Sequence, residues 1–223
     1  MPIIYLLRHA QSTANAKGVL AGRDNSVELT KQGFVQAKKL VQVLDQLEIG
    51  KILSSPLTRC LQTIEPFRAR SGKIPFSQDE RLIEMDYGIW SGHKLSKLAR
   101  KNEWRTIQTT PSKFTFPGGE SFKSMRSRVE NLFKSLDGHR EPVLLVTHGD
   151  IVKMFLAVAA GLKIDGFQKF VIEPGSISTI GSKRGAYSIL GSNTYPTRAL
   201  QNNVTNTIGG GDFLVNKLMW WKR

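Results

Sequence analysis

The sequence has 223 residues but a single cysteine, Cys60, and no apolar run of the ~20 residues that a membrane span requires. One cysteine cannot form an internal disulfide or a cluster of thiolate metal ligands. The first residues also lack the basic region, apolar core and cleavage site of a secretory signal. These absences predict a cytoplasmic protein with no membrane span.

Acidic residues are few: 18 Asp and Glu stand against 32 Lys and Arg, which gives a formal net charge of +14. Such a surplus attracts anions, including phosphorylated metabolites, nucleic acids and acidic membranes. The basic residues are spread along the chain, however, and no compact basic block with interleaved aromatic residues is present. We therefore expect no nucleic acid partner and interpret most of this charge as a solvated surface.

Common cofactor motifs are missing as well. The chain has no glycine-rich Walker loop, no dinucleotide fingerprint and no His-x-x-x-His pair. Of its four histidines, only His9 and His148 follow strand-like segments, whereas His93 is expected at an exposed helix start. The sequence therefore predicts no cofactor and no metal site.

The most informative segment that is present is Arg8-His9, which follows an apolar, β-rich run over residues 3–7. Ligands of open α/β sheets bind at the carboxyl ends of strands, so we expect His9 to lie at a reactive place. A guanidinium beside an imidazole offers a fork for phosphate oxygens next to a nitrogen that can attack phosphorus. The pair therefore predicts phosphoryl chemistry.

Two later strand-like runs end in a similar way. Residues 51–53 lead to Ser54-Ser55-Pro56 and Arg59, and residues 143–147 lead to His148. A helical pattern follows each run. The sequence thus offers three candidate phosphate-binding segments, each near the end of a strand.

Strand-like runs that alternate with helical patterns imply parallel pairing with right-handed crossovers. We therefore predict an α/β fold, a three-layer α/β/α sandwich with a mostly parallel central sheet. Thr30 is expected to cap one helix, and Pro56 to lie in the first turn of another. β-rich pieces near residues 170–172, 176–180 and 187–190 are expected to extend the sheet as an antiparallel edge.

No Pro/Ser-rich linker or break in composition divides the chain. We expect a single domain over residues 1–200, with an inserted region at about 84–117 that covers the active site. Residues 201–223 are expected to form a C-terminal tail of unknown role. A docked or oligomer-forming tail would be consistent with a homodimer.

Together, these segments resemble the histidine phosphatase superfamily, which includes the cofactor-dependent phosphoglycerate mutases. The chain departs from the family pattern at Ala10, where glycine is usual, and at Gln11, where many mutases carry glutamate. Residues 12–23 look most like actinobacterial members of the phosphatase branch. The matching stretches occur in the order of the family: Arg8-His9 with Asn15, Leu29-Thr30 with Gly33, Gln36 and Ala37, Ser54-Ser55-Pro56 with Arg59, Glu84 to Gly92, Gly118-Gly119-Glu120-Ser121 and Thr147-His148-Gly149.

The resemblance implies that His9 is the nucleophile and forms a phosphohistidine that water then hydrolyses. Positive charge near His9 would keep its attacking nitrogen unprotonated. Preorganised donors would replace a metal in stabilising the transferring phosphoryl group. The expected catalytic residues are His9, Glu84, Arg8, Arg59 and His148, and the expected substrate-binding residues are Arg8, Asn15, Arg59, His148 and Gly149.

Glu84 is the candidate general acid, which requires a carboxyl group whose pKa is raised by burial or by a neighbouring acid. Asp86 lies two residues away and is its competitor, although the family pattern places the acid at Glu84. Other charged residues near these motifs we interpret as solvated or capping groups: Asp24, Glu28 and Asp150, and Lys123, Arg126 and Arg128 on the outer side of a helix expected over about 120–136.

The leading functional hypothesis is a metal-independent phosphomonoesterase that acts through a phosphohistidine on a small phosphorylated metabolite. A cofactor-dependent phosphoglycerate mutase is the alternative, but mutases shield their phosphohistidine with longer insertions than residues 84–118 provide. An alternative of another class is a basic protein that binds phosphate or nucleic acid without catalysis. The sequence does not identify the substrate.

Overall fold

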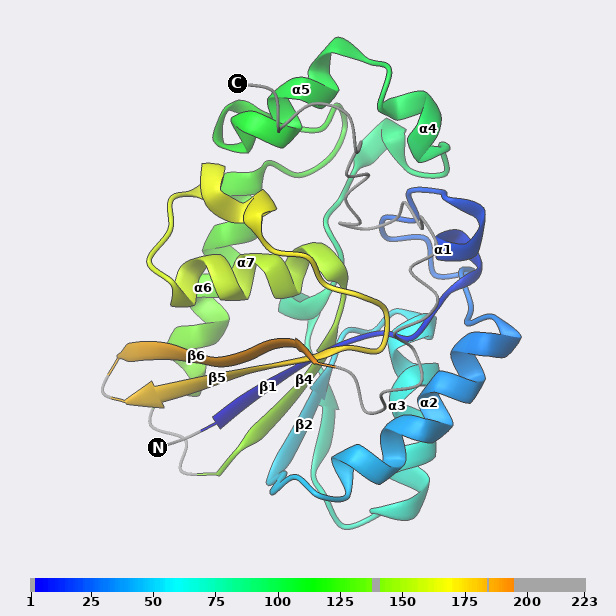
Figure 1. Cartoon of the computed structure of the whole chain (residues 1–223), viewed down its shortest axis with the longest axis vertical. Helices are drawn as coiled ribbons and strands as arrows, with labels where there is room; N and C mark the ends of the chain where they lie inside the picture. The colour runs from blue at the N-terminus through cyan, green and yellow to red at the C-terminus, as the bar shows by residue number, and fades with distance from the viewer. Residues whose placement is uncertain (1–2, 138–140, 184, 195–223) are drawn as a thin grey trace, which may run out of the picture.

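A computed structural model describes residues 3–137, 141–183 and 185–194 of the chain. Its centre is a sheet of six strands in the order β3-β2-β4-β1-β5-β6 (Figure 1). The expected tail over 201–223 lies outside the described residues. The strands are β1 (Ile3–Arg8), β2 (Lys51–Ser54), β3 (Phe76–Gln78), β4 (Val143–Thr147), β5 (Ile177–Lys183) and β6 (Ala186–Thr194).

The pairing of the strands confirms the predicted sheet. β1, β4, β2 and β3 pair in parallel, while β5 runs antiparallel to both β1 and β6. The expected strand near Phe170–Ile172 is wrong, because this stretch is irregular chain. The three-residue strand β3 was not predicted, since so short a segment shows no periodicity.

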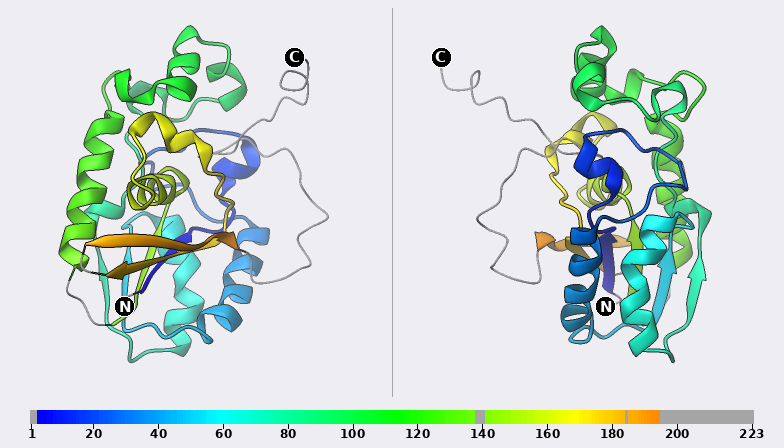
Figure 2. Two further views of the ribbon diagram at one scale, coloured as in Figure 1. Left: turned by 60° about the vertical axis from the view of Figure 1, so that its left-hand side comes forward. Right: turned by 90° about the vertical axis from the view of Figure 1, so that its right-hand side faces the viewer.

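Helices cover both faces of the sheet and produce the predicted three layers (Figures 1 and 2). α2 (Lys31–Leu44) and α3 (Thr58–Arg70) lie on one face, whereas α6 (Phe122–Leu136) and α7 (Gly149–Ala159) lie on the other. Successive residues of a strand point to opposite faces. Tyr5 and Leu7 of β1 accordingly pack with α2 and α3, whereas Ile4 and Leu6 pack with α6 and α7.

Of the two helix starts expected from local signals in the sequence, one is confirmed. The Thr30 side chain accepts a hydrogen bond from the N–H of Gly33, so it caps α2 as predicted. The expected place of Pro56 in the first turn is wrong: Leu57 is the N-cap of α3, and Pro56 lies just before this cap, two residues ahead of the helix. Three residues, 55–57, thus separate the end of β2 from the start of α3.

Residues 84–117 contain only short helical segments, of which α4 (Leu95–Leu98) and α5 (Asn102–Thr109) lie at the top of Figure 1. Their aromatic side chains pack edge-to-face around Phe116, for example Tyr87 and Trp90 at centroid distances of 5.0 and 5.5 Å. A Cβ on Gly88, which has a φ of +51°, would lie 2.1 Å from the Pro117 carbonyl oxygen, so glycine is needed there. The remaining elements are α1 (Thr13–Lys17), η1 (Glu80–Leu82), η2 (Gly88–Trp90), η3 (Pro111–Lys113) and η4 (Ile164–Lys169).

Backbone hydrogen bonds tie this region to the segment that follows α1. The N–H of Leu20 donates to His93 O at 3.0 Å, and the N–H of Leu95 donates to Gly18 O at 2.9 Å. None of the described helices is both long enough and apolar enough to cross a membrane.

Candidate active site

The sheet brings the predicted strand-end residues together. β1 and β4 are neighbours with Arg8 opposite Thr147, so His9 and His148 follow these strands side by side. The backbone N–H of His9 donates to Thr147 O at 2.9 Å, and the two imidazole rings meet edge to face with centroids 5.2 Å apart. Because the strands run in parallel, their polar ends share one edge of the sheet.

A small, narrow cleft lies at this edge. It contains five of the predicted residues but neither His148 nor Gly149, which are buried behind its wall. Its lining consists of Arg8, His9, Ser12, Asn15, Val19, Leu20, Ala21, Gly22, Arg59, Glu84 and Tyr87.

His9 is held as a neutral imidazole. Its Nδ1 lies 2.7 Å from Ala10 O, and because a carbonyl oxygen can only accept, Nδ1 carries the hydrogen. The lone pair is therefore on Nε2. Burial lowers the pKa of His9 well below its usual value, and the charges of Arg59 and Arg8 lower it further. The sequence predicted the effect of the arginines but not that burial would be the larger cause.

The two arginines of the cleft are buried and oriented by main-chain carbonyls. Arg59 donates to Gly22 O at 2.7 Å and to Asp24 O at 3.0 Å. Arg8 donates to Ile172 O. Because this carbonyl is bonded to a guanidinium and not to a neighbouring strand, the bond helps to explain why residues 170–172 do not form the expected strand. Main-chain carbonyls thus fix the orientation of both guanidinium groups in the cleft, where such forks suit the oxygens of an anion.

Glu84 is buried in the same cleft. Its Oε1 accepts the N–H of Met85 at 3.0 Å. Burial, followed by the charge of Asp150, raises the pKa of Glu84 to about 7, although Arg59 and Arg8 oppose the shift. The side chain of Asp86 is 36% exposed and lies 3.6 Å from Arg23. The geometry therefore favours Glu84 over Asp86 as a carboxyl group that holds a proton near neutral pH.

Two arginines hold the backbone of Glu84 from outside the cleft. Arg23 Nε and Arg128 Nη2 donate to the carbonyl oxygen of Glu84 at 3.0 and 3.3 Å. Glu120 pairs with both arginines, at 3.2 Å to Arg23 and 2.9 Å to Arg128. The interpretation of Arg128 as a solvated residue is therefore wrong. Glu120 belongs to a motif that the sequence singled out, but its role was not foreseen.

Asn15 contributes to the cleft in a more specific way than the sequence indicated. Its Oδ1 accepts the backbone N–H of Ser12 at 3.0 Å and the Ser12 hydroxyl at 2.9 Å, which completes a capping box at the start of α1. Since the oxygen is occupied, the amide NH2 group is what Asn15 can offer to a ligand.

His148 is fully buried, and its Nε2 lies 2.8 Å from the Ser55 hydroxyl. Burial and the charge of Arg59 lower the pKa of His148 well below its usual value, so it is also neutral. Its Nδ1 lies 3.9 Å from Glu84 Oε2. His148 thus lies between Ser55 and the carboxyl of Glu84.

Asp150 is buried, so its interpretation as a solvated or capping group is wrong. The Tyr87 hydroxyl donates to Asp150 Oδ2 at 2.8 Å. A signal was present in the sequence: α7 is apolar almost all round, and a charged residue in a fully buried helix needs an internal partner. Neither Asp150 nor Tyr87 was a predicted site residue.

Within the described ranges, no group of three or more His, Cys, Asp or Glu side chains could hold a metal ion. What the cleft does offer is a neutral imidazole, two buried guanidinium groups and a carboxyl group with a raised pKa. Such a set can bind a phosphoryl group, attack it and protonate a leaving oxygen. Fold and cleft together are suited to a phosphoryl-transfer enzyme.

Comparisons with known proteins agree with this class. A family model described as histidine phosphatase superfamily (branch 1) matches residues 4–194. Phosphoserine phosphatase 1 of Hydrogenobacter thermophilus is 29% identical over 181 residues, which cover 79% of this chain and 85% of that protein. A Proteus mirabilis protein named "Probable phosphoglycerate mutase GpmB" is 30% identical over 183 residues, covering 79% and 83% of the two chains.

A solved structure of mycobacterial glucosyl-3-phosphoglycerate phosphatase has the same fold, with a TM-score of 0.79 and 23% identity over 87% of this chain and all of that one. This chain belongs to the histidine phosphatase superfamily, branch 1. The predictions of the family and of a histidine-phosphatase type of phosphoric monoester hydrolase are confirmed at that level. The special likeness to actinobacterial members stays a prediction.

Proposed function

We propose that this chain is a metal-independent phosphomonoesterase that forms a phosphohistidine on His9 and acts on a small phosphorylated metabolite. The observation that carries the proposal is the buried, neutral imidazole of His9 in a cleft with the guanidinium groups of Arg8 and Arg59. A neutral imidazole has a lone pair that can attack phosphorus, whereas an imidazolium has none. His9 therefore meets the first requirement of covalent phosphoryl transfer.

In the first step, Nε2 of His9 attacks phosphorus in line with the leaving oxygen, so that an N–P bond forms and the ester P–O bond breaks. Arg8, Arg59 and the NH2 group of Asn15 stabilise the charge on the equatorial oxygens. Glu84 gives its proton to the leaving oxygen, because a pKa of about 7 leaves much of this carboxyl protonated at neutral pH. The first product is a neutral alcohol.

In the second step, water attacks the phosphohistidine. The carboxylate of Glu84 takes a proton from this water, an O–P bond forms, and the N–P bond breaks to return neutral His9. Inorganic phosphate is the second product. We assign His148 and Gly149 to supporting the phosphoryl site from behind, since the ring of His148 packs against that of His9.

The substrate class proposed for this site is an alkyl phosphate that also carries a carboxylate. Phosphoserine and a phosphoglycerate derivative are the compounds in the names of two of the similar proteins, and both have this chemistry. The net charge of +14 favours an anionic substrate.

The proposal is tested by measuring phosphate release from phosphoserine, 3-phosphoglycerate and an aryl phosphate in the presence of a chelator. We expect turnover with the chelator present, and none in His9→Ala, the matched control. Activity that is lost in the chelator and restored by Mg²⁺ or Zn²⁺ would contradict the metal-free mechanism. Undiminished turnover in His9→Ala would contradict the covalent one.

The similarity to the Proteus mirabilis protein keeps a mutase as the second candidate. The two functions differ in the fate of the phosphoryl group, which a mutase returns to the sugar acid and a phosphatase gives to water. Interconversion of 2- and 3-phosphoglycerate without phosphate release would favour the mutase. Tight binding of phosphate with neither reaction would leave the non-catalytic alternative.

A further inference from the structure

Asp150 is a second buried carboxyl group close to the cleft, and the proposed reaction assigns it no role. It lies in the first turn of α7, and only 8% of its surface is exposed. Burying a charged carboxylate is costly unless partners compensate. Its presence in an otherwise apolar helix therefore calls for a physical reason.

The partners of Asp150 stabilise a negative charge. The Tyr87 hydroxyl donates to Oδ2 at 2.8 Å, and the ammonium of Lys153, one helical turn further along α7, lies 3.9 Å from Oδ1. Lys153 in turn donates to Gln168 Oε1 at 3.0 Å, so its position is fixed by η4. Hydrogen bonds and positive charge favour the ionised form of a carboxyl group.

The carboxyl of Glu84 differs in its direct contacts, since among the described residues neither a hydroxyl group nor a Lys or Arg side chain is bonded to it. Its hydrogen-bond partner among the described residues is the N–H of Met85, and the neutral ring of His148 lies 3.9 Å away. Tyr87, three residues further on, lines the same cleft as Glu84 and is bonded to Asp150 behind it.

Charged and titratable groups face Glu84 from every surrounding element. Arg8 comes from β1, Arg59 and Cys60 from α3, and His148 from the end of β4, while Tyr87 follows in the same loop and Asp150 comes from α7. The two arginines favour ionisation of Glu84. Of the other groups, Asp150 opposes it most strongly, second only to burial.

We propose that Asp150 is a positioning residue that keeps the proton on Glu84: the Tyr87 hydroxyl and Lys153 hold negative charge on Asp150, and this buried charge opposes ionisation of the Glu84 carboxyl. This inference deepens the proposed function and rests on it for the acid role of Glu84. Like charges close together in a buried site prevent both groups from ionising at once. Asp150 thus keeps the general acid Glu84 protonated although Asp150 itself does not contact the substrate.

The first test needs no substrate. The side-chain carboxyl carbons of Glu and Asp are labelled with ¹³C, and NMR follows their titration in the whole protein, with Glu84→Gln to assign the Glu84 signal. In Asp150→Asn we expect the midpoint of Glu84 to fall by about one pH unit, because a buried like charge is removed. Asp86→Asn, which removes an exposed carboxyl two residues from Glu84, is the matched control and should leave the midpoint in place.

Tyr87→Phe is the second variant, and it decides the matter if Asp150→Asn does not fold. It keeps the Asp150 carboxyl but removes the hydrogen bond that favours its ionised form. We therefore expect the protonated fraction of Asp150 to rise and that of Glu84 to fall. An unchanged Glu84 midpoint in Asp150→Asn, or an unchanged proton distribution in Tyr87→Phe, would overturn the proposal.

The second test follows kcat/KM against pH. With phosphoserine, the high-pH limb should move down by about one pH unit in Asp150→Asn, which at pH 7.5 corresponds to a loss of about eightfold. An aryl phosphate, whose leaving group needs little protonation, should show a smaller change. If the wild-type protein hydrolyses no phosphomonoester, the proposed function fails, while the NMR titration still decides the role of Asp150.

Discussion

Two arginines of helix α3, Arg59 in its first turn and Arg68 in its last turn, differ in burial and in the groups that they contact. Arg59, in the first turn, is almost fully buried and is held by the carbonyls of Gly22 and Asp24. Arg68, in the last turn, is 35% exposed and pairs with Glu65 at 2.9 Å. One helix thus presents the same type of side chain to two hollows, one near its first turn and one near its last.

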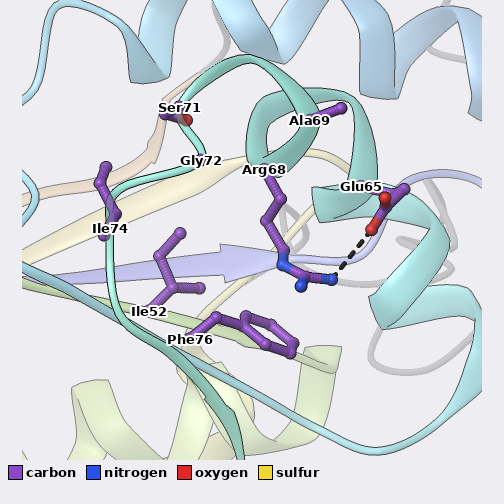
Figure 3. A pocket seen from close by; sticks show the side chains of 8 residues that line it. All are labelled: Ile52, Glu65, Arg68, Ala69, Ser71, Gly72, Ile74 and Phe76. Atoms are coloured by element: carbon purple, nitrogen blue, oxygen red, sulfur yellow. Dashed lines mark hydrogen bonds and ion pairs between the residues drawn. The ribbon is translucent and has the colours of Figure 1, made fainter.

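Figure 3 shows the second hollow, in which the guanidinium of Arg68 lies over the ring of Phe76, 3.6 Å from its centroid. Apolar side chains such as Ile52 and Ile74 form much of its wall. The charge of Arg68 is already balanced by Glu65, whereas in the part of the chain that the structure describes no carboxylate forms an ion pair with Arg59. A hollow attracts an anion when its cation is fixed but not neutralised, and concavity alone is insufficient.

The largest effect is expected from removing the proposed nucleophile of the cleft, for which the hollow at Arg68 has no counterpart among its described lining residues. His9→Ala should reduce turnover to background, because the proposed nucleophile is gone, while the midpoint of urea unfolding stays close to that of the wild-type protein. Quench-flow trapping should find acid-labile phosphate in the wild-type protein only. Labelled phosphate trapped on another residue would remove His9 from the mechanism.

Glu84→Gln tests whether Glu84 protonates the leaving oxygen of the substrate. We expect a loss of roughly 10²–10⁴-fold in the phosphorylation step with an alkyl phosphate, since general acid catalysis is removed. The loss in single-turnover phosphorylation of His9 should be much smaller for an aryl phosphate. Equal losses with both substrates would argue against the acid role, and a normal Glu84→Gln with an impaired Asp86→Asn would transfer the role to Asp86.

The comparison of the two arginines is itself testable with paired variants. Arg59→Lys keeps the charge but loses the fork, and we expect kcat/KM to fall by about 10²–10³-fold. Arg68→Lys, the matched change at the other end of α3, should leave kcat/KM within about twofold, because it lies outside the cleft. Similar losses in both would show that α3 as a whole, and not the cleft, responds to the substitution.

The smallest effect is expected from Arg68→Ala. Its ion pair is largely exposed, since the side chain of Glu65 is 63% exposed, so most of the loss should come from the contact with Phe76. We expect the free energy of unfolding to fall by about 0.5–1 kcal/mol with no change in activity. A large fall in kcat/KM would link this hollow to the cleft and break the comparison.

The sequence was sufficient for those parts of the fold and site that depend on local patterns. Apolar runs and alternating helical patterns predicted the layers, and the parallel register then placed Arg8-His9 beside His148. Strand ends are predictable because polar residues follow directly on a buried run. The same logic predicted that Arg59 would lie near them, after β2.

Sequence reasoning failed where a residue's partner is distant in the chain. Asp150 is 63 residues from Tyr87, and Arg23 is 97 residues from Glu120, so no local pattern indicates these pairs. Arg128 lies on a helix whose polar side looks solvated until the loop of Glu84 packs over it. Tertiary contacts, and not helix periodicity, decide whether such charges are buried.

The way Arg59 is held has a consequence for the end of the reaction. Carbonyl dipoles orient its guanidinium without occupying it as a carboxylate would, so the phosphoryl group of a substrate does not have to displace one from it. Inorganic phosphate presents the same oxygens and enters as easily. In the proposed reaction, the released phosphate therefore competes with the substrate for the cleft, and we expect added phosphate to lower the rate of turnover. The rate of the proposed reaction should therefore fall as its own product accumulates around the protein.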